Sequence, residues 1–414
     1  MVTELVCVSC GERVAAAPRH AMTCTTCGPD RGTLDYAYDL AALRRRWARP
    51  DAPGGLATWL PLLPLRDGGS LPRLAVGPTP LVDAPRLANH LGVGRILLKL
   101  DSFLPSLSLK DRASALAVAQ AGEWGCPTIV AASTGNAASS LATLAAASGC
   151  RAVLLVPQDA PMGKLAQIAL HGGILIPIQG TYDQAFDLST EVAARQGWYI
   201  RSTAVNPVLA EGKKTAALET ALQMSWDVDD AWFVGVGDGC IFGALWKGLS
   251  ELSAVGWIRK IPALMGVQAE GAAPLAQAWE ARANVVPWHA TTTFADSIAV
   301  GHPRDWVKAL RAARSSGGAI MAVPDTLISE AMTLMARHAG VLAEPAGAAS
   351  VAGILAGVDC GRLGRSDRVV AMVTGHGLKD AASLRRTFVM PTPVPPTLEA
   401  VIAAAPHDEE RSRG

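Results

Sequence analysis

The sequence lacks an excess of charge of either sign. Lysine and arginine number 37 against 36 aspartate and glutamate residues, so the formal net charge of the 414-residue chain is +1. Binding to nucleic acid or to an anionic membrane surface through electrostatics needs a basic field. We therefore expect no nucleic-acid partner, and the composition favours a small-molecule substrate.

Long apolar runs are also missing. Residues 1–14 have neither the basic start nor the unbroken apolar core of a secretory signal, and later alanine-rich stretches are interrupted by charge, glycine or proline. We expect no membrane partner and a cytoplasmic location. Aromatic residues make up 5% of the chain, and its eleven tryptophans are scattered. This spacing favours core packing over a stacking platform.

Cysteine is sparse, with eight residues, yet four of them fall within the first 27. Cys7 and Cys10 form one C-x-x-C pair, and Cys24 and Cys27 form another after thirteen intervening residues. Two such pairs can offer four thiolates in the closed tetrahedron of structural zinc. Free thiols or a redox pair are the alternative. If Zn²⁺ binds, no ligand position remains for water, so the metal is expected to support folding.

Beyond the cysteines, apolar segments alternate with helical patterns. Expected strands lie at 95–100, 128–132, 152–156, 174–178, 232–236, 264–268, 319–323 and 369–373. Expected helices include 111–123, 137–148, 164–171, 182–196, 241–252 and 326–339. Valine-, isoleucine- and leucine-rich strands alternating with amphipathic helices predict an α/β fold with buried parallel sheets.

The chain divides by composition into four parts. Residues 1–35 form the zinc-ribbon-like segment, and residues 36–80 form a linker and N-terminal extension whose proline and glycine content predicts an extended connector over 50–80. Residues 81–390 form the main α/β region. Residues 391–414 are rich in proline and then in charge, and we expect the last dozen to be mobile.

The segment SLSLKDR, residues 106–112, follows an expected strand and places Lys110 in the first turn of an alanine-rich helix. A cation is unfavourable at the positive end of a helix dipole. The same position lowers the pKa of an amine, as an aldehyde cofactor requires of its lysine. Taken alone, a solvated surface lysine explains this feature better.

Two further strand-to-helix turns carry polar or glycine-rich patterns. The segment ASTGN, residues 132–136, offers amide donors and one asparagine suited to an anionic oxygen, although an ordinary capped turn explains it equally well. The segment GVGDGC, residues 235–240, lets backbone amides converge on a phosphate at a helix N-terminus. Its spacing differs from the G-x-G-x-x-G fingerprint of dinucleotide sites.

These motifs, followed by VTGHGLKD at 373–380, occur in the order and rough spacing of the threonine synthases, which the chain resembles from about residue 77 to residue 380. VPQDAPMGKLAQ, VNPVLAEGKKT and EPAGAAS, at 157–167, 205–215 and 344–350, belong to the same resemblance. It implies the two-domain tryptophan-synthase-β-like fold of type II, with parallel-rich sheets covered by helices, after an N-terminal zinc ribbon. Pyridoxal 5'-phosphate (PLP) would lie between two interleaved α/β subdomains.

Carried over by motif, Lys110 would hold PLP as a Schiff base and shuttle the proton. Asn136 would contact the phenolic oxygen of the cofactor, and Thr374 would face its pyridine nitrogen. The amides of the glycine turn would cradle the phosphate; they belong to Gly235, Val236, Gly237, Asp238, Gly239 and Cys240. The residues expected to bind the amino-acid substrate are Ser108, Ser133, Thr134, Gly135 and Lys164. The resemblance also implies a homodimer.

The sequence departs from the family where substrate is chosen. Threonine synthases usually have T-G-S-F-K-D-R at the lysine, and this chain lacks that glycine and phenylalanine. They also tend to have N-P-x-R-x-E-G, whereas the arginine position is Leu209 here. An apolar side chain cannot pair with a phosphate, so Lys164, Lys213 or Lys214 would have to compensate. Two reactions stay open: O-phosphohomoserine to threonine, and β-replacement or β-elimination on an O-activated serine. A non-catalytic PLP-binding protein is a third, weaker possibility.

Overall fold

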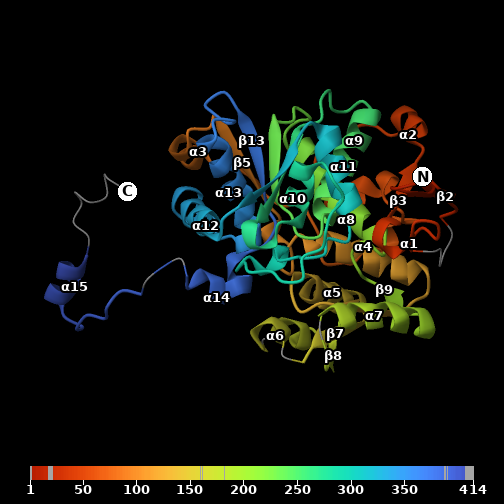
Figure 1. The fold of residues 1–414 in the computed structure, drawn as a ribbon, viewed down its shortest axis with the longest axis horizontal. Helices are drawn as coiled ribbons and strands as arrows, with labels where there is room; N and C mark the ends of the chain where they lie inside the picture. The colour runs from red at the N-terminus through yellow and green to blue at the C-terminus, as the bar shows by residue number, and fades with distance from the viewer. Residues whose placement is uncertain are drawn as a thin grey trace.

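The computed structural model describes residues 2–16, 22–158, 160, 162–180, 182–386, 388 and 390–405. Within these residues the strands form three separate sheets. Figure 1 shows the N-terminal sheet packed at one end of the molecule, while the segment after α14 extends away at the other end. No helix in the described part of the chain combines the length and apolarity needed to cross a bilayer.

The N-terminal sheet is antiparallel, with β1 (Val2–Cys7) between β2 (Arg13–Val14) and β3 (Leu34–Tyr38). A short helix α1 (Gly28–Arg31) precedes β3, and α2 (Leu40–Arg46) follows it. Because β3 runs through Tyr38, this sheet extends beyond residue 35, where the ribbon segment was expected to end.

The six-stranded sheet has the order β12-β11-β10-β13-β5-β4, and β4 is its antiparallel edge. Its strands are β4 (Leu81–Asp83), β5 (Arg95–Leu100), β10 (Ala231–Gly235), β11 (Ala263–Ala269), β12 (Ala319–Val323) and β13 (Arg368–Val373). Both faces are covered. On β10, Trp232 packs with α8 (Val208–Gln223) and α9 (Cys240–Ala254), and Phe233 packs on the side of α12 (Asp325–Ala339) and α13 (Pro345–Asp359). Neighbouring residues of one strand thus bury opposite faces.

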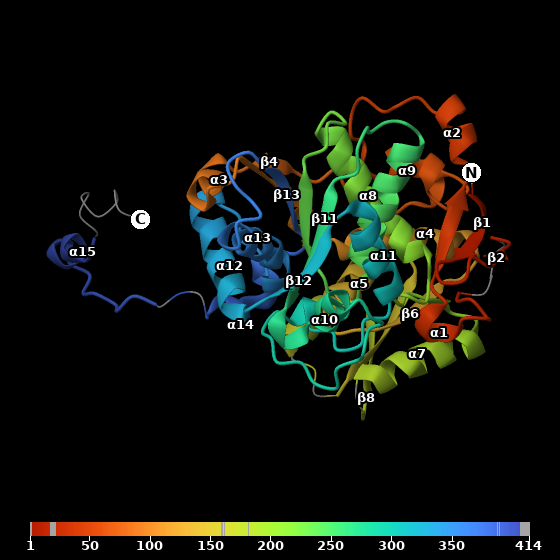
Figure 2. The same cartoon turned by 45° about the horizontal axis from the view of Figure 1, so that its top comes forward.

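The four-stranded sheet is inserted between β5 and β10 in the chain and has the order β8-β7-β6-β9, all parallel. Its strands are β6 (Thr128–Ala132), β7 (Arg151–Pro157), β8 (Ile174–Ile178) and β9 (Tyr199–Ile200). Its helices are α5 (Asn136–Ser148), α6 (Met162–Leu170) and α7 (Tyr182–Gln196), and α4 (Lys110–Glu123) also packs against it. Figure 2 shows α7 and β8 together at one side of the molecule, apart from β12 and β13.

The segment 50–80 is not the extended connector that its prolines predict. It contains two 3₁₀ helices, η1 (Gly55–Leu62) and η2 (Gly68–Ser70), and Trp59 and Leu62 are buried in the main core. A 3₁₀ helix tolerates proline at its start and in short turns because it makes few internal hydrogen bonds. The apolar residues between the prolines therefore determine its packing.

The remaining elements connect the two larger sheets to their covering helices. They are α3 (Pro85–Leu91), η3 (Asp101–Phe103), η4 (Glu270–Ala272), α10 (Pro274–Ala281), η5 (Asp296–Ile298), α11 (Trp306–Ser316), η6 (Gly377–Asp380), α14 (Ala381–Leu384) and α15 (Leu398–Ala404). Residues 406–414, which include most of the expected mobile end, lie outside the described residues. The eight strands expected from the sequence are all present, each within a residue or so of its expected bounds.

Candidate active site

Four loops at the carboxyl ends of strands carry the residues singled out from the sequence. The lysine segment follows β5 and η3, the ASTGN turn follows β6, the glycine turn follows β10, and the TGHG segment follows β13. In open α/β sheets, ligands bind outside the carboxyl ends of strands. The six-stranded sheet contributes three of these loops and the four-stranded sheet contributes one, so the site lies where both sheets present these ends.

Backbone hydrogen bonds tie the lysine segment to the TGHG segment. The Leu109 N–H donates to the Thr374 carbonyl at 2.9 Å, and the His376 N–H donates to the Leu107 carbonyl at 3.1 Å. Ser108 forms an isolated antiparallel bridge with Gly375 between these bonds. Thr374 and Ser108 are consequently fixed beside Lys110, and both are buried.

Asp111 fixes the other end of the lysine segment. Its carboxylate accepts the Ser106 N–H at 2.6 Å and the Ser106 hydroxyl at 2.5 Å. Asp111 is fully buried, and burial raises the pKa of its carboxyl. Both hydrogen bonds close a turn immediately before α4, so the direction in which Lys110 leaves the helix start is set by local structure.

Lys110 is half-buried at the first position of α4. Burial, followed by the neighbouring charges of Lys213 and Arg201, lowers the pKa of its amine to about 8. Glu344 and Cys240 act in the opposite direction and are outweighed. At pH 7 an amine with this pKa is deprotonated in about a tenth of molecules, far more often than an ordinary lysine, and only the neutral amine is nucleophilic.

Leu107 holds a left-handed backbone conformation, with φ of 63°. For a residue with a Cβ this conformation costs about 1 to 2 kcal/mol, and glycine avoids the cost. Leu107 occupies the position at which the resemblance led us to expect glycine. The turn geometry thus explains why glycine is expected there, and this chain keeps the turn with a strained residue instead.

Asn136 begins α5 and is buried. Its side-chain amide donates to the two carboxylate oxygens of Glu344, at 3.0 and 2.9 Å, and to the Ser297 hydroxyl at 3.2 Å. Burial raises the pKa of the Glu344 carboxyl. Ser133, Thr134 and Gly135 precede Asn136 in the same turn and are half-buried, so their polar groups remain partly accessible to a ligand.

The glycine turn leads into α9, and its glycines have neighbours where a side chain would begin. A Cβ on Gly235 would come 2.3 Å from the Ala346 carbonyl oxygen, and one on Gly237 would come 2.9 Å from Val300. Gly239 has φ of 93°, which favours glycine. Val236 and Cys240 are buried, and the Lys213 ammonium contacts the Cys240 sulfur at 2.8 Å. A cation and free amides at a helix N-terminus suit a phosphate.

Asp238 brings a carboxylate into this turn, and its contacts explain how the turn tolerates it. The carboxylate accepts the Arg304 N–H at 2.6 Å, so it is directed toward the loop before α11. Burial and the neighbouring Asp305 raise the pKa of Asp238 to about 6. The Val236 N–H, which was expected to hold the phosphate, instead donates to the Val267 carbonyl at 2.8 Å and is not available. No described residue accepts the N–H groups of residues 237–240, so these amides remain available as donors.

The TGHG segment adds a histidine and a lysine. The His376 ring accepts the Leu378 N–H at 3.2 Å and caps η6, which gives it a structural role. The Lys379 ammonium donates to the Ser106 carbonyl, the Ser139 hydroxyl and the Gln167 carboxamide, at 2.8 to 2.9 Å. Lys379 therefore joins the six-stranded sheet's loop to helices of the four-stranded sheet.

The three lysines expected to substitute for an arginine at position 209 lie in different surroundings. Leu209 itself is fully buried on α8. Lys214 is also fully buried and pairs with Glu211 and Glu251 at 2.5 and 2.7 Å, so it belongs to an internal ionic cluster. Lys213 lies at the glycine turn. The side chain of Lys164 lies outside the described residues, although its backbone belongs to α6.

Sequence reasoning missed roles for three residues at this site, Glu344, Arg201 and Lys379, and it considered Lys213 only for the substrate phosphate. Glu344 and Lys379 belong to motifs that carry the resemblance, so their positions could have been marked. Arg201 follows the two-residue strand β9, and no pattern around it indicates a site. Its proximity to Lys110 depends on how the four-stranded sheet packs.

The N-terminal cysteines form a separate cluster. The sulfur atoms of Cys7, Cys10, Cys24 and Cys27 all lie within 4.8 Å of one another, and those of Cys10 and Cys24 are 3.8 Å apart. Hydrogen bonding with Cys10, then burial and Cys7, raises the pKa of Cys27 to about 12. Four ligand atoms at zinc–sulfur distances of about 2.3 Å would stand about 3.8 Å from one another. The cluster therefore has the size of a tetrahedral thiolate site.

Two surface cavities of about 570 and 700 Å³ occur elsewhere on the molecule. Their linings include none of the four loops described above. Volume alone therefore does not identify the candidate active site. The convergence of Lys110, Asn136, the glycine turn and Thr374 does.

Comparison with known proteins gives a family match. Residues 72–375 match the family model described as "Pyridoxal-phosphate dependent enzyme". The chain is 35% identical over 379 residues to "Threonine synthase" of Methanocaldococcus jannaschii, covering 90% of this chain and 92% of that protein. It is 37% identical over 351 residues to "Threonine synthase" of Mycobacterium leprae, covering 84% and 95%.

Solved structures support the fold. The processed form of threonine deaminase isoform 2 from Solanum lycopersicum superposes with a TM-score of 0.65 at 22% identity, covering 75% of this chain and 82% of that one. Maize serine racemase gives 0.63 at 22% identity, with 75% and 91% covered. At these identities the likeness extends to the fold and no further. The type II fold expected from the sequence is confirmed.

Proposed function

Because the chain belongs to the pyridoxal-phosphate-dependent enzymes, as a lyase similar to threonine synthase, we propose that it converts O-phosphohomoserine and water into threonine and phosphate. One observation carries the proposal: the Lys110 amine, with a pKa lowered to about 8, lies among the asparagine, glycine turn and threonine that the motifs predicted. The matches of 33 to 37% identity to proteins named threonine synthase support the choice of reaction.

The residues present fit PLP. Lys110 would hold its aldehyde carbon, and the amides of residues 237–240, with Lys213, would hold its phosphate. Asn136 would contact the phenolic oxygen and Thr374 the ring nitrogen, where a hydroxyl would leave that nitrogen unprotonated. When bound, the cofactor supplies an electron sink that stabilises negative charge on the substrate carbon.

Within this site the chain's own groups would orient the substrate and move protons. Ser133, Thr134 and Gly135 would hold the substrate carboxylate at the start of α5, with Ser108 beside them. Lys110 would accept the α-proton and return a proton later, since its pKa lies close to a working pH near neutrality. Lys164 stays a candidate for binding the substrate's far end.

Leu209 carries no charge, so a phosphate on the substrate would need cations from other residues. Arg201 is 2% exposed and close enough for its charge to lower the Lys110 pKa. Lys379 lies over Ser106 and Ser139, next to the lysine segment. We propose that these two side chains replace the arginine expected at Leu209, because a guanidinium and an ammonium both bind phosphate oxygens. Lys379 would exchange one of its three internal hydrogen bonds, such as that to Gln167, for a phosphate oxygen.

Leu209 also supports a second candidate, β-replacement or β-elimination on an O-activated serine. The buried leucine provides no cation for the phosphate of a phosphorylated homoserine. An O-activated serine is one carbon shorter, so its activated group would lie closer to the cofactor and farther from position 209. The two reactions give different products from different substrates, so one experiment can separate them. A non-catalytic PLP-binding protein remains the weakest alternative.

The test supplies purified holoenzyme with O-phosphohomoserine, O-phosphoserine and O-acetylserine in turn. We expect phosphate release and threonine formation from the first substrate, and losses of at least tenfold in kcat/KM for Arg201→Gln and Lys379→Gln. Arg362→Gln, at an exposed arginine after α13, is the control. Acetate or phosphate release from either serine ester, with none from O-phosphohomoserine, would establish the second candidate instead. A cofactor spectrum that no amino acid alters would support the non-catalytic alternative.

We further propose that Cys7, Cys10, Cys24 and Cys27 bind one structural Zn²⁺. The fit of sulfur spacing to tetrahedral coordination supports this. Chelation should unfold the N-terminal sheet, seen as loss of amide protection over residues 2–38, while most cofactor absorbance is retained. A chain that carries no zinc after purification from zinc-supplemented medium would contradict it.

The homodimer and the cytoplasmic location stay predictions, to be checked by sedimentation and by fractionation.

A further inference from the structure

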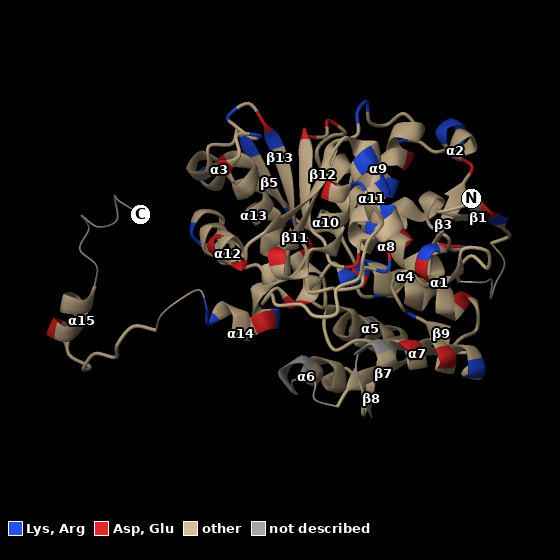
Figure 3. Ribbon diagram, in the orientation of Figure 1, with Lys and Arg blue, Asp and Glu red and all other residues tan. Residues whose placement is uncertain are grey.

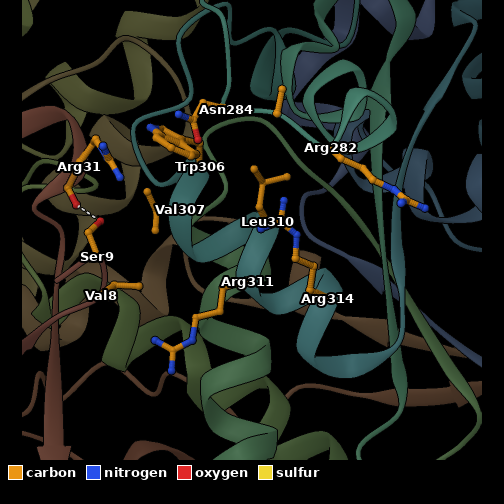
Figure 4. Close-up of a pocket in the computed structure, with 11 residues that line it drawn as sticks. Val8, Ser9, Arg31, Arg282, Asn284, Trp306, Val307, Leu310, Arg311 and Arg314 are labelled. Atoms are coloured by element: carbon orange, nitrogen blue, oxygen red, sulfur yellow. Dashed lines mark hydrogen bonds between the residues drawn. The ribbon is translucent and has the colours of Figure 1, made fainter. Parts of the chain in front are cut away.

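The cavity of about 570 Å³ lies between the N-terminal sheet and α11, away from the four loops of the candidate active site. Four arginines line it: Arg31 from α1, Arg282 after α10, and Arg311 and Arg314 from α11. Ser9 and Asn284 add neutral polar groups. Figure 4 shows Arg31 and Ser9 on one side of the cavity and the α11 residues next to them, while the Arg282 side chain extends away on the far side from Arg31.

The four guanidinium groups have no carboxylate partner among the described residues. Arg311 lies over the Trp246 ring at 5.1 Å, and no ion pair or hydrogen bond of the described side chains engages the guanidinium of Arg31, Arg282 or Arg314. The nearby acids are already paired: Asp35 with Lys308 at 2.8 Å, and Asp30 with His302 at 3.1 Å. The charge of Arg311 also helps to lower the pKa of the Asp35 carboxyl, so this acid, which is paired with Lys308, compensates part of the positive charge. The other three arginines keep their charge without an acid partner among the described residues, and Figure 3 shows basic residues along α11.

Contacts between the two walls hold the cavity in shape. The Lys308 ammonium donates to the Leu34 carbonyl at 2.9 Å and joins α11 to β3. The Ser9 hydroxyl donates to the Arg31 carbonyl at 2.5 Å, which joins the first cysteine turn to α1. The cavity is thus built by contacts between distant parts of the chain, and its arginines project from fixed backbone positions.

Arg282 is also placed at a conformational cost. It ends α10 with φ of 51°, a left-handed position that most often carries glycine. An arginine there loses stability that a glycine would keep, so stability alone does not account for it.

We propose that this cavity is a binding site for a small polyanion, bearing either phosphate groups or several carboxylates, at a place distinct from the PLP site. Arginine presents paired donors that match both groups. The volume lies within the range of small-molecule sites. Four cations around a hollow with no internal acid are arranged to compensate at least two negative charges of a ligand.

The experiment is calorimetric titration of the holoenzyme, whose own phosphate site is filled, with inorganic pyrophosphate and separately with citrate at constant ionic strength. We expect at least one of the two to bind with one site per chain. Binding of pyrophosphate alone would identify a phosphate ligand, and binding of citrate alone would identify a polycarboxylate. Binding of both would identify a site that selects ligands by their negative charge.

Variants assign the binding to this cavity. R311Q/R314Q should weaken binding at least tenfold, whereas R362Q/R365Q, with the same loss of charge at exposed arginines beyond α13, should leave it unchanged. R282G should weaken binding without lowering the melting temperature, a combination that a purely structural arginine would not give. Absence of binding by both anions, or equal weakening by the two double variants, would overturn the proposal.

Discussion

Two lysines of this chain, the half-buried Lys110 and the buried Lys247, have side-chain pKa values that shift in opposite directions. Burial and the cations Lys213 and Arg201 lower the pKa of Lys110 to about 8. Burial also lowers the pKa of Lys247, but Glu211, Glu251 and Asp35 outweigh it and raise that pKa above its ordinary value. The comparison teaches that burial alone does not make a lysine reactive. The sign of the neighbouring charges decides whether the amine loses its proton.

The hydrogen bonds of the two amines differ in the same sense. Lys247 donates to the Tyr36 carbonyl at 2.9 Å and pairs with Glu211 at 3.2 Å and with Glu251. The Lys110 ammonium makes no hydrogen bond or ion pair with any described residue. The Lys247 amine is therefore engaged in internal contacts beneath the N-terminal sheet, whereas the Lys110 amine is available to a ligand.

The most direct test of the difference between Lys110 and Lys247 is to remove each amine by substitution, and the largest effect is expected at Lys110. Lys110→Ala should lower kcat at least 10³-fold, about 4 kcal/mol of transition-state stabilisation, because it removes the amine that would transfer the proton. The loss of one half-buried side chain should change the melting temperature little. Steady-state kinetics with the active substrate and thermal unfolding measure the two effects.

Mass mapping after borohydride reduction supplies the matching control. The wild-type chain should carry the cofactor adduct on Lys110, and Lys247→Met should carry it at the same position. An adduct that persists in Lys110→Ala, or that maps to Lys247, would remove the distinction between the two amines.

Lys247→Met tests the structural lysine. Loss of its ammonium leaves Glu211 and Glu251 with Lys214 as their remaining cation, and breaking a buried ion pair costs about 3 kcal/mol or more. We expect denaturant unfolding to show that loss. Lys260→Met is the control: its pair with Asp230 is about half exposed on both sides, so the change should cost less than about 1 kcal/mol. Equal effects of the two variants would contradict the role given to burial.

The sequence predicted the parts of this molecule that depend on local pattern. Buried parallel strands such as β5 and β6 are short apolar runs between turn residues, and the expected bounds match the observed ones. Helices α8 and α13 were not among the expected helices because they are buried on nearly all sides. An all-round buried helix has no polar face and gives no 3.6-residue period.

The site shows the same limit. Lys110, Asn136 and Thr374 were found because each belongs to a motif of several residues. Arg201 contributes through its charge alone, and its place beside Lys110 results from the packing of β9 against β6, which two apolar residues do not reveal. The cluster around Lys247 was missed for a related reason: its acids lie on α8 and α9, and a single sequence does not show that these helices pair.

The pH dependence of PLP capture tests whether the pKa of Lys110 is lowered relative to that of an ordinary lysine. Because the pKa of Lys110 is lowered to about 8, the fraction of neutral amine rises with pH through that value and levels off above it. The rate at which apoenzyme captures PLP should therefore increase roughly tenfold per unit below pH 8 and become flat above it. Stopped-flow absorbance measures the rate. A rate that keeps rising to pH 10 would indicate an amine of ordinary pKa, like that of an exposed lysine.

The smallest expected effect concerns the turn that presents Lys110. Leu107→Gly removes a side chain from a backbone position with φ of 63°, while the exposed leucine gives up little buried area. We expect the free energy of unfolding to rise by about 1 kcal/mol, less the entropy that glycine adds to the unfolded chain. Leu109→Gly, at a fully buried neighbour with ordinary helical backbone, should instead destabilise the fold. If Leu107→Gly is stabilising and leaves kcat unchanged, the strain serves no catalytic purpose; if kcat falls while stability rises, the strained turn helps to position the amine.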